Sequence, residues 1–311
     1  MIKKILITGG AGNVGGALAR YLAKDNDLDI TIIDNLSTGS LLKLPSSELT
    51  NWKFINADVN ELNDLLEIFT SNSFDYVFHY AAVVGVKRTL ENPNLVLGDV
   101  DGMKNILEAS KESSVKRVFF SSSSEVYGEP VEIPQTEYGT PLNSRLPYAI
   151  VKNISEAYLK SYKQMFDLDY TIFRFFNTYG PLQSDDFVVS KFIRQAMNNE
   201  DITINGAGNQ TRTFCYIDDN IEATTKCFYE GHVLNDIMNV GDDNEITILE
   251  LAQLVIDVVG NKVNIVHKPA LKEGDMMRRR PDITKMKSII GHDLLPLKEG
   301  IKKVYLEFKK T

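Results

Sequence analysis

A glycine-rich turn near the start of the chain limits the folds that this sequence can adopt. Residues 4–8 form an apolar run typical of a buried strand, and a helical pattern covers about residues 14–23. Gly9, Gly12 and Gly15 lie between the two patterns and at the start of the helix. Glycines at this spacing permit a tight turn, let backbone N–H groups approach a pyrophosphate and let the helix pack closely on the strand. The pattern therefore predicts the first strand and helix of a dinucleotide-binding α/β sheet.

An acidic residue at the end of the next predicted strand, Asp34, narrows the choice of dinucleotide. It closes the apolar run at residues 30–34, about 20 residues after the glycine turn, where a carboxylate can accept hydrogen bonds from both ribose hydroxyls. The same carboxylate would repel the 2′-phosphate of NADP. We therefore expect NAD as the cofactor. The alternative interpretation is a glycine turn in an unrelated α/β protein.

Apolar runs alternate with helical patterns over more than half of the chain. Alternation of this kind predicts a parallel sheet that helices cover on both faces. The apolar runs lie at about 4–8, 30–34, 53–56, 75–82, 117–122 and 169–175, and the helical patterns at about 14–24, 61–70, 95–111 and 147–165.

The alternation ends after residues 177–181, and the segments at 187–198, 202–205 and 248–259 suggest a smaller mixed lobe. We expect an α/β fold: a Rossmann-type, doubly wound parallel sheet with a smaller mixed α/β substrate lobe. The expected domains are residues 1–180, to which the chain returns at about 212–235, and residues 181–311.

Composition and charge disfavour several classes of partner. The 311 residues carry a net charge of −8, which argues against binding to nucleic acid or to an acidic membrane. No apolar run reaches membrane-spanning length, and the first residues lack the pattern of a secretion signal. Two cysteines, Cys215 and Cys227, imply no disulfide framework, so we expect a cytoplasmic protein. The spacing of His, Cys and Asp predicts no metal site.

A tyrosine and a lysine one helical turn apart, Tyr148 and Lys152, indicate acid/base chemistry on a substrate hydroxyl. A tyrosine ordinarily loses its proton near pH 10, so it can act as a base at neutral pH only if its phenolate is stabilised. A lysine four residues later lies on the same face of the helix and can provide that stabilisation. Ser123, 25 residues before the tyrosine, would hold the substrate oxygen while the phenolate takes the proton.

Several further motifs follow one another in a single order along nearly the whole chain. Together they resemble the extended short-chain dehydrogenases/reductases, in particular the NAD-dependent epimerase/dehydratase group, whose members are enzymes that modify nucleotide-diphosphate sugars. The segments that carry the resemblance are TGGAGNVG at 8–15, Asp34 with Asn35, Asn56 to Asp58, HYAA at 79–82, SSSSEVYG at 121–128, YAIVK at 148–152, RFFN at 174–177, YGP at 179–181 and QTR at 210–212.

The resemblance also implies roles for individual residues. Asp58 would contact the adenine, Lys152 the nicotinamide ribose, Asn177 the sugar diphosphate, and Arg212 a phosphate or a substituent of the sugar. Further cofactor contacts are expected from Asn13, Val14, Asn35, Val59, Ala81, Ala82, Ser121 and Tyr148, and further substrate contacts from Val188, Arg278 and Arg279. The resemblance implies UDP as the nucleotide of the substrate. It also implies a homodimer built from the helices near 95–111 and 147–165.

Members of this group share a first step and differ in the step that follows. Tyr148 would take the proton of the sugar 4-hydroxyl while hydride passes from carbon 4 to NAD, which leaves a 4-keto sugar. The ketone is then reduced from its other side by a 4-epimerase, loses water in a 4,6- or 5,6-dehydratase, or allows loss of carbon dioxide in a decarboxylase. We expect Ser123, Ser124 and Glu125 to take part in catalysis together with Tyr148 and Lys152.

Short segments distinguish these reactions, and they point in different directions. Residues 123–125 (SSE) are similar to the Thr-Ser-Glu of UDP-glucuronate decarboxylases, and residues 210–214 and 279–283 favour the same class. Residues 81–86 (AAVVGV) are more similar to a UDP-hexose 4-epimerase of the UDP-glucose or UDP-N-acetylglucosamine type. Asp99 also departs from the family pattern, in which many members carry Asn. A decarboxylase is our first hypothesis, a 4-epimerase the second and a dehydratase the third.

Two alternatives of other classes are also considered. Relatives that lose the tyrosine or the lysine can become NAD-sensing regulatory proteins, but this chain keeps both Tyr148 and Lys152. A simple NADPH-dependent ketone reductase of the same superfamily is disfavoured by Asp34.

Overall fold

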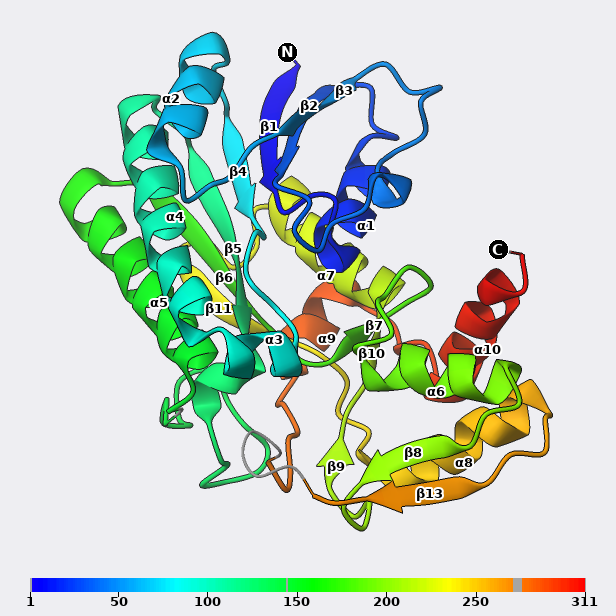
Figure 1. The fold of residues 1–311 in the computed structure, drawn as a ribbon. Coiled ribbons are helices and arrows are strands. Elements are labelled where there is room, and N and C mark those ends of the chain that lie inside the picture. Colours follow the sequence, from blue (N-terminus) through cyan, green and yellow to red (C-terminus); the bar gives the residue numbers. More distant parts are fainter. Residues whose placement is uncertain (1, 144, 271–275, 311) are drawn as a thin grey trace. The chain divides into compact units, whose positions relative to one another are not determined.

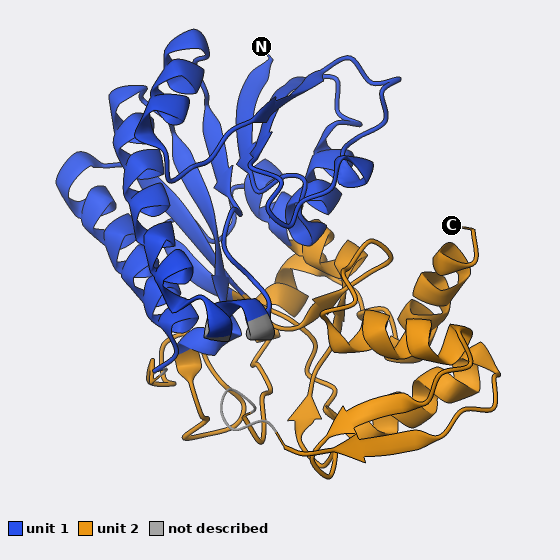
Figure 2. Cartoon of the chain, in the orientation of Figure 1, with its two compact units in different colours: residues 1–126, 145–174, 224–238 blue, residues 127–144, 175–223, 239–311 orange. Residues whose placement is uncertain are grey.

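A computed structural model describes residues 2–143, 145–270 and 276–310. The chain forms two compact units, which Figure 2 distinguishes by colour. The first unit contains residues 1–126, 145–174 and 224–238, and the second contains residues 127–144, 175–223 and 239–311. Both units are therefore built from separate stretches of sequence.

The first unit is organised around a seven-stranded sheet (Figure 1). The neighbouring pairs from β3 to β5 run parallel, and the strand order reverses between β1 and β4. In an open α/β sheet, ligands bind at the carboxyl ends of the strands where the order reverses. In spatial order the strands are β11 (Asp236–Val240), β6 (Asp169–Phe175), β5 (Arg117–Ser123), β4 (Tyr76–His79), β1 (Lys3–Thr8), β2 (Leu28–Asp34) and β3 (Trp52–Asn56).

Helices cover both faces of this sheet (Figure 1). On one face, α2 (Leu62–Ser71), α4 (Pro93–Glu112) and α5 (Pro147–Phe166) pack on a core cluster that includes Leu6, Val77 and Val118. On the other face, stacked rings of Phe78 and Phe119 meet Phe228 near the end of α7 (Ile217–Tyr229). Because both faces are covered, consecutive residues such as Ile5, Leu6 and Ile7 are fully buried, and β1 shows no polar alternation. The first unit also contains α1 (Asn13–Leu22), α3 (Val86–Glu91) and the 3₁₀ turn η1 (Leu41–Lys43).

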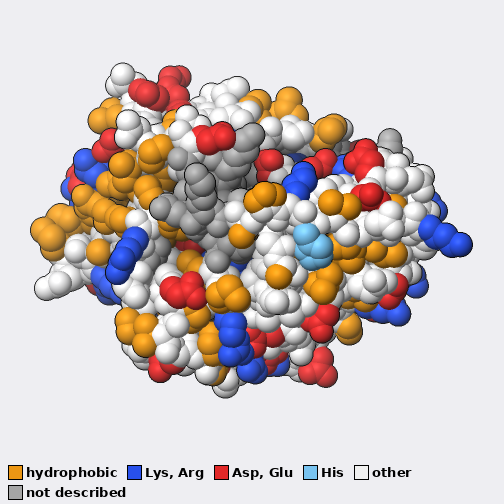
Figure 3. Space-filling model, turned by 60° about the horizontal axis from the view of Figure 1, so that its bottom comes forward, with side chains coloured by type: hydrophobic (Ala, Val, Ile, Leu, Met, Phe, Trp, Pro, Cys, Tyr) orange, Lys and Arg blue, Asp and Glu red, His pale blue; other side chains and the backbone are white. Residues whose placement is uncertain are grey.

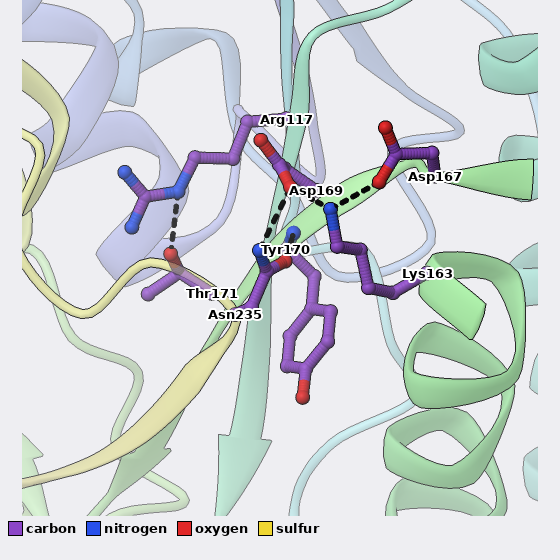
Figure 4. Close-up of polar contacts among 7 residues, drawn as sticks. All are labelled: Arg117, Lys163, Asp167, Asp169, Tyr170, Thr171 and Asn235. Atoms are coloured by element: carbon purple, nitrogen blue, oxygen red, sulfur yellow. Dashed lines mark hydrogen bonds and ion pairs between the residues drawn. The ribbon is translucent and has the colours of Figure 1, made fainter.

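Hydrogen bonds and an ion pair tie the segment before β11 to the start of β6 (Figure 4). The side chain of Asn235 accepts from the Tyr170 backbone N–H at 3.0 Å and donates to Asp169 at 2.8 Å. Asp169 also pairs with Lys163 of α5 at 2.7 Å. On the neighbouring strand, the buried Arg117 donates to Thr171 Oγ1 at 2.7 Å. These contacts fix the outer edge of the sheet after a long excursion of the chain through the second unit.

The second unit contains short strands and helices around its own core. Strands β8 (Ile202–Asn205) and β13 (Ile265–Lys268) pair in parallel, and α6 (Val188–Met197), α8 (Ile248–Val259) and α10 (Leu297–Phe308) pack together. Two-residue strands pair as β7 (Thr178–Tyr179) with β10 (Cys215–Tyr216) and as β9 (Thr211–Arg212) with β12 (Ile246–Thr247). The unit also includes α9 (Thr284–Ile290). The chain passes from the first unit to the second within the 3₁₀ turn η2 (Ser124–Tyr127), because Tyr127 is the first residue assigned to the second unit.

The fold class predicted from the sequence is confirmed, and the predicted strands and helices occur within a few residues of their expected bounds. The largest difference is at 75–82, where β4 ends at His79. There the hydroxyl of Thr8 accepts hydrogen bonds from the N–H groups of Tyr80 and Ala81, both at 3.1 Å. These bonds to a side chain end the regular backbone pairing of the strand. Within the described ranges, no helix has the length and hydropathy needed to cross a bilayer.

The two compact units follow boundaries different from residues 1–180 and 181–311. Residues 224–238 belong to the first unit, which overlaps the expected return of the chain at about 212–235. Residues 127–144 belong to the second unit, where the Gln135 N–H donates to the Arg280 carbonyl at 2.8 Å and Asn239 Nδ2 donates to the Gln135 carbonyl at 3.0 Å.

Candidate active site

The glycine turn after β1 forms a backbone cradle that side chains would fill. Gly9 has a φ of +67°, and a Cβ at this position would lie 2.6 Å from the backbone nitrogen of Ala81, just after β4. A Cβ at Gly12 or Gly15 would lie 2.9 or 2.3 Å from the Gly9 carbonyl oxygen. The turn is therefore compact because it contains no side chains at these three positions. No side chain caps the first turn of α1 at Gly12, so its N–H groups remain available to an anion.

The carboxylate of Asp34 is fixed at the end of β2, beside the glycine turn. It is 9% exposed, its Oδ2 accepts from the Ala11 N–H at 3.0 Å, and its Oδ1 accepts from the Leu36 N–H at 2.8 Å. Gly39 provides the space around it, because a Cβ there would lie 2.6 Å from Asp34 Oδ1. Each carboxylate oxygen keeps a second lone pair that can accept from a ribose hydroxyl.

The other predicted cofactor residues surround this position on the same unit. Asn35 donates to Asp58 Oδ2 at 2.8 Å, which joins the ends of β2 and β3. Val59 is buried, and Asn13 and Val14 are half-buried in the first turn of α1. The compact glycine cradle, the uncapped helix start and the fixed carboxylate together fit an adenine dinucleotide with a free 2′-hydroxyl.

Lys152 is buried beneath the first turn of α5, and Tyr148 lies one turn before it. The lysine is 3% exposed, its Nζ donates to the Ser121 carbonyl at 2.7 Å, and the same nitrogen lies 5.7 Å from the centre of the Tyr148 ring. Burial lowers the pKa of Lys152 to about 8, while the carboxylates of Asp99 and Glu156 act in the opposite direction. The ammonium group is therefore mostly protonated at pH 7, where its charge favours a phenolate at Tyr148.

The serine segment at the end of β5 is anchored at several points. Ser121 Oγ donates to the His79 carbonyl at 3.4 Å, and Ser122 Oγ donates to Glu156 at 2.6 Å. Ser123 Oγ accepts from the Glu125 N–H at 3.2 Å, which starts the turn η2. Ser123 and Ser124 are 9% and 2% exposed, and Glu125 is half-buried. The first unit thus contains all five predicted catalytic residues, on β5, η2 and α5.

A buried ion pair supports this region from behind. Arg174 of β6 donates to both carboxylate oxygens of Glu156, at 2.9 and 2.7 Å, and both side chains are 2% exposed or less. The role of Glu156 was not predicted from the sequence. Glu156 follows Lys152 by four residues, so the sequence does place both on one face of the helix.

His79 is packed rather than placed for proton transfer. Its Nδ1 lies 2.8 Å from the Thr8 hydroxyl, which itself accepts from two backbone N–H groups and so donates its proton to the ring. Burial, and secondarily the charge of Lys152, lowers the pKa of His79 to about 3. The imidazole is therefore neutral at physiological pH. Over the described parts of the chain, no group of three or more His, Cys, Asp or Glu residues could hold a metal ion.

The residues predicted to bind substrate belong to the second unit, and their local surroundings differ. Asn177 donates to the Thr213 carbonyl at 3.0 Å, and Arg212 on β9 is 9% exposed. Val188 is half-buried in the first turn of α6. Arg278 is exposed and forms a two-point ion pair with Glu245, whereas Arg279 is 5% exposed. Arg279 also donates to the Met276 sulfur at 3.0 Å.

Comparisons with known proteins agree with this geometry. The family model described as "NAD dependent epimerase/dehydratase family" matches residues 5–241. A UDP-N-acetyl-α-D-glucosaminuronate decarboxylase of Bacillus cytotoxicus is 36% identical over 100% of this chain and 99% of its own. A putative UDP-glucose 4-epimerase of Methanocaldococcus jannaschii is 35% identical over 96% of each chain. The crystal structure of a Thermotoga maritima UDP-glucose 4-epimerase with UDP-glucose superposes with a TM-score of 0.92 at 30% identity, covering 99% of both chains.

Proposed function

The chain belongs to the NAD-dependent epimerase/dehydratase family, and on this basis we propose that it decarboxylates a UDP-hexuronate through a transient 4-keto sugar. NAD is the cofactor, in line with the glycine cradle and with Asp34. In this proposal Gly9, Gly12 and Gly15 leave room for the pyrophosphate, and Asp34 accepts from the adenosine ribose. Asn177, Arg212 and Arg279 of the second unit bind the sugar diphosphate.

The first chemical step uses Tyr148 and Lys152. The phenolate of Tyr148 takes the proton of the sugar 4-hydroxyl, and Ser123 donates a hydrogen bond to the same oxygen. The buried ammonium of Lys152 stabilises the phenolate before the transfer. NAD, held by the glycine turn and Asp34, would supply the hydride acceptor at carbon 4. The product of this step is a ketone at carbon 4.

Loss of carbon dioxide follows from the position of the ketone. A carboxylate on carbon 5 is β to the new carbonyl, so the bond between carbons 5 and 6 can break with its electrons delocalised into an enolate. A proton then adds to carbon 5. Return of a hydride to carbon 4, together with the proton that Tyr148 took in the first step, would restore the 4-hydroxyl and the phenolate. Ser124 and Glu125, at the start of η2 directly after Ser123, are the residues that we assign to control of this second step.

The observation that carries the choice of reaction is the Ser123–Ser124–Glu125 segment. The sequence of this segment resembles the corresponding segment of decarboxylases. It lacks the aspartate by which 4,6-dehydratases protonate a leaving hydroxyl. The 36% identical relative is itself named as a decarboxylase of a UDP-linked 2-acetamido hexuronate, which makes that sugar a second substrate to test.

A 4-epimerase is the second candidate. The segment 81–86 resembles epimerases, and the 35% identical relative is named as a putative UDP-glucose 4-epimerase. In that reaction the 4-keto sugar rotates within the site and receives the hydride on its other face, so neither carbon dioxide nor water is lost.

Product mass distinguishes these reactions. The protein is incubated with UDP-glucuronate, UDP-N-acetylglucosaminuronate, UDP-glucose and UDP-N-acetylglucosamine, and the products are measured by chromatography with mass spectrometry. We expect loss of one carbon dioxide from a hexuronate. An unchanged mass with altered retention on a neutral sugar would establish epimerisation instead, and loss of one water molecule would establish dehydration.

We also propose a homodimer in the cytoplasm. On α5, the exposed face carries Ile150 and Ile154 one turn apart, followed by Ala157 and Ser161 at helical spacing. Such a stripe of apolar and small residues favours helix packing against a second copy. The face drawn in Figure 3 shows acidic, basic and apolar side chains, with apolar ones gathered toward its left. Both cysteines are buried and neither forms a disulfide, which suits a reducing compartment.

Sedimentation equilibrium tests the homodimer. The wild-type protein is expected to have twice the mass of one chain, and Ile154→Asp is expected to lower the measured mass toward that of a single chain, because the substitution places a charge in the packed face. A wild-type protein that sediments as a single chain at all concentrations would contradict the proposal.

A further inference from the structure

An acidic side chain on α4, Asp99, connects two parts of the proposed site. Its Oδ2 accepts a hydrogen bond from the Val83 N–H at 2.8 Å, and it also bonds with the side chain of Asn60. Val83 lies in the loop that leaves β4, two residues after Ala81, whose backbone contacts the Gly9 turn. Asp99 therefore holds the loop that borders the glycine cradle.

Asp99 lies on α4, which packs on α5, the helix that carries Lys152. Among the charges that act on this lysine, Asp99 has a larger effect than Glu156, whose charge is already shared with Arg174. Burial raises the pKa of the Asp99 carboxyl, while the Val83 N–H and the charge of Lys152 oppose that effect. Asp99 is thus a partly buried acid whose ionised form is favoured by the Val83 N–H and, to a smaller extent, by the charge of the lysine.

Other titratable groups also face this pair. His79 of β4 is neutral, since burial lowers its pKa to about 3. Glu156 is engaged by Arg174 and by Ser122. Asp58 after β3 acts on Asp99 as a like charge. Asp99 is therefore the acid near Lys152 that lacks an arginine partner among its described contacts, so its charge is felt by Lys152 and, through it, by Tyr148.

We propose that Asp99 is a positioning residue that anchors the loop after β4 and sets the charge balance around Lys152 and Tyr148. This inference rests on the proposed proton transfer by Tyr148. A negative charge at Asp99 favours the protonated lysine and disfavours the phenolate, so both groups keep their protons to higher pH than they would without it. The acid on α4 thereby sets the pH range over which the lysine is charged and the tyrosine can accept a proton.

Two variants separate the charge from the hydrogen bond. Asp99→Asn keeps an oxygen that can accept from Val83 but removes the charge, and Asp99→Leu removes both. Asp101→Asn is the matched control, because Asp101 is exposed on the same helix, where it pairs with Lys104 at 3.3 Å. Asp99→Ser, which also lacks the charge, replaces Asp99→Asn if that variant does not fold.

Three quantities are measured: the pH dependence of kcat/KM, the amount of NAD retained after purification, and the pKa of Tyr148. The last is obtained from the ultraviolet absorbance of tyrosinate, as the difference between each protein and the same protein carrying Tyr148→Phe. For Asp99→Asn we expect both limbs of the pH profile and the Tyr148 titration to move down by about 1 pH unit, the size of a Coulomb interaction at intermediate dielectric, with NAD content unchanged. Asp99→Leu should in addition lose NAD, and Asp101→Asn should behave as the wild type.

Two outcomes would overturn the inference. If Asp99→Asn titrates and turns over with the wild-type pH dependence, the charge has no role at Lys152. If Asp99→Leu retains NAD as the wild type does, the loop needs no anchor at this position. The tyrosinate titration requires no turnover, so a protein that is inactive on every UDP-sugar would refute the proposed function while the role of Asp99 could still be measured.

Discussion

Replacing Tyr148 by Phe is expected to lower kcat by about 10²–10⁴-fold while NAD stays bound, because the substitution removes only the oxygen that takes the substrate proton. The ring of Phe fills the same space in the first turn of α5, and Lys152 keeps its bond to the Ser121 carbonyl. Turnover of the best UDP-sugar from the product assay and the NAD content of the purified protein are the two measurements.

Tyr158→Phe is the matched control for this prediction. Tyr158 lies on the same helix and packs against the core cluster of the first unit. The control should keep turnover within a few-fold of the wild type. If Tyr148→Phe also turned over at the wild-type rate, another group would have to be the base, and the proposed mechanism would be wrong.

Replacing Arg174 by Met is expected to lower the free energy of unfolding by about 3–5 kcal/mol, because it leaves the carboxylate of Glu156 buried without its counterion. Both side chains are 2% exposed or less, so water cannot replace the lost partner. Chemical denaturation followed by circular dichroism measures the change, on protein freed of NAD so that cofactor binding does not contribute.

Two further variants sharpen this test. Lys104→Met removes one member of the exposed pair with Asp101 and should change stability by less than about 1 kcal/mol. The double variant Glu156→Leu with Arg174→Met removes both charges and should recover much of the loss, since apolar side chains can replace a buried pair. An Arg174→Met protein as stable as Lys104→Met would mean that Glu156 contributes no buried charge.

The sheet of the first unit could be predicted because its signals are local. Each predicted strand there is a short apolar run, and each predicted helix has apolar residues at helical spacing, so burial pattern and chain order suffice. Strand β11 is the exception, because Asp236–Val240 is short and follows a long excursion of the chain. Its place beside β6 depends on Asn235, which bonds to Asp169 and Tyr170 more than 60 residues earlier.

Part of the candidate site also has local signals in the sequence. Gly9, Gly12, Gly15 and Asp34 have roles that follow from spacing along one strand, turn and helix. Spacing did not show which charges lie near Lys152. Asp99 is 53 residues away and Arg174 is 22 residues away, and they reach this region only because α4 packs on α5 and because β6 lies beside β5.

The sequence by itself determined the fold class, the family, the cofactor and the expected tyrosine and lysine pair, because each is encoded by neighbouring residues whose backbone geometry and burial follow from their order. Only the tertiary structure decided how the charges are arranged around that pair. Electrostatic interaction depends on distance through space and on burial, and neither can be read from positions along a chain. Tyr148 and Lys152 could be recognised from a helical turn, whereas Asp99, Glu156 and Arg174 acquire their roles only in the folded sheet.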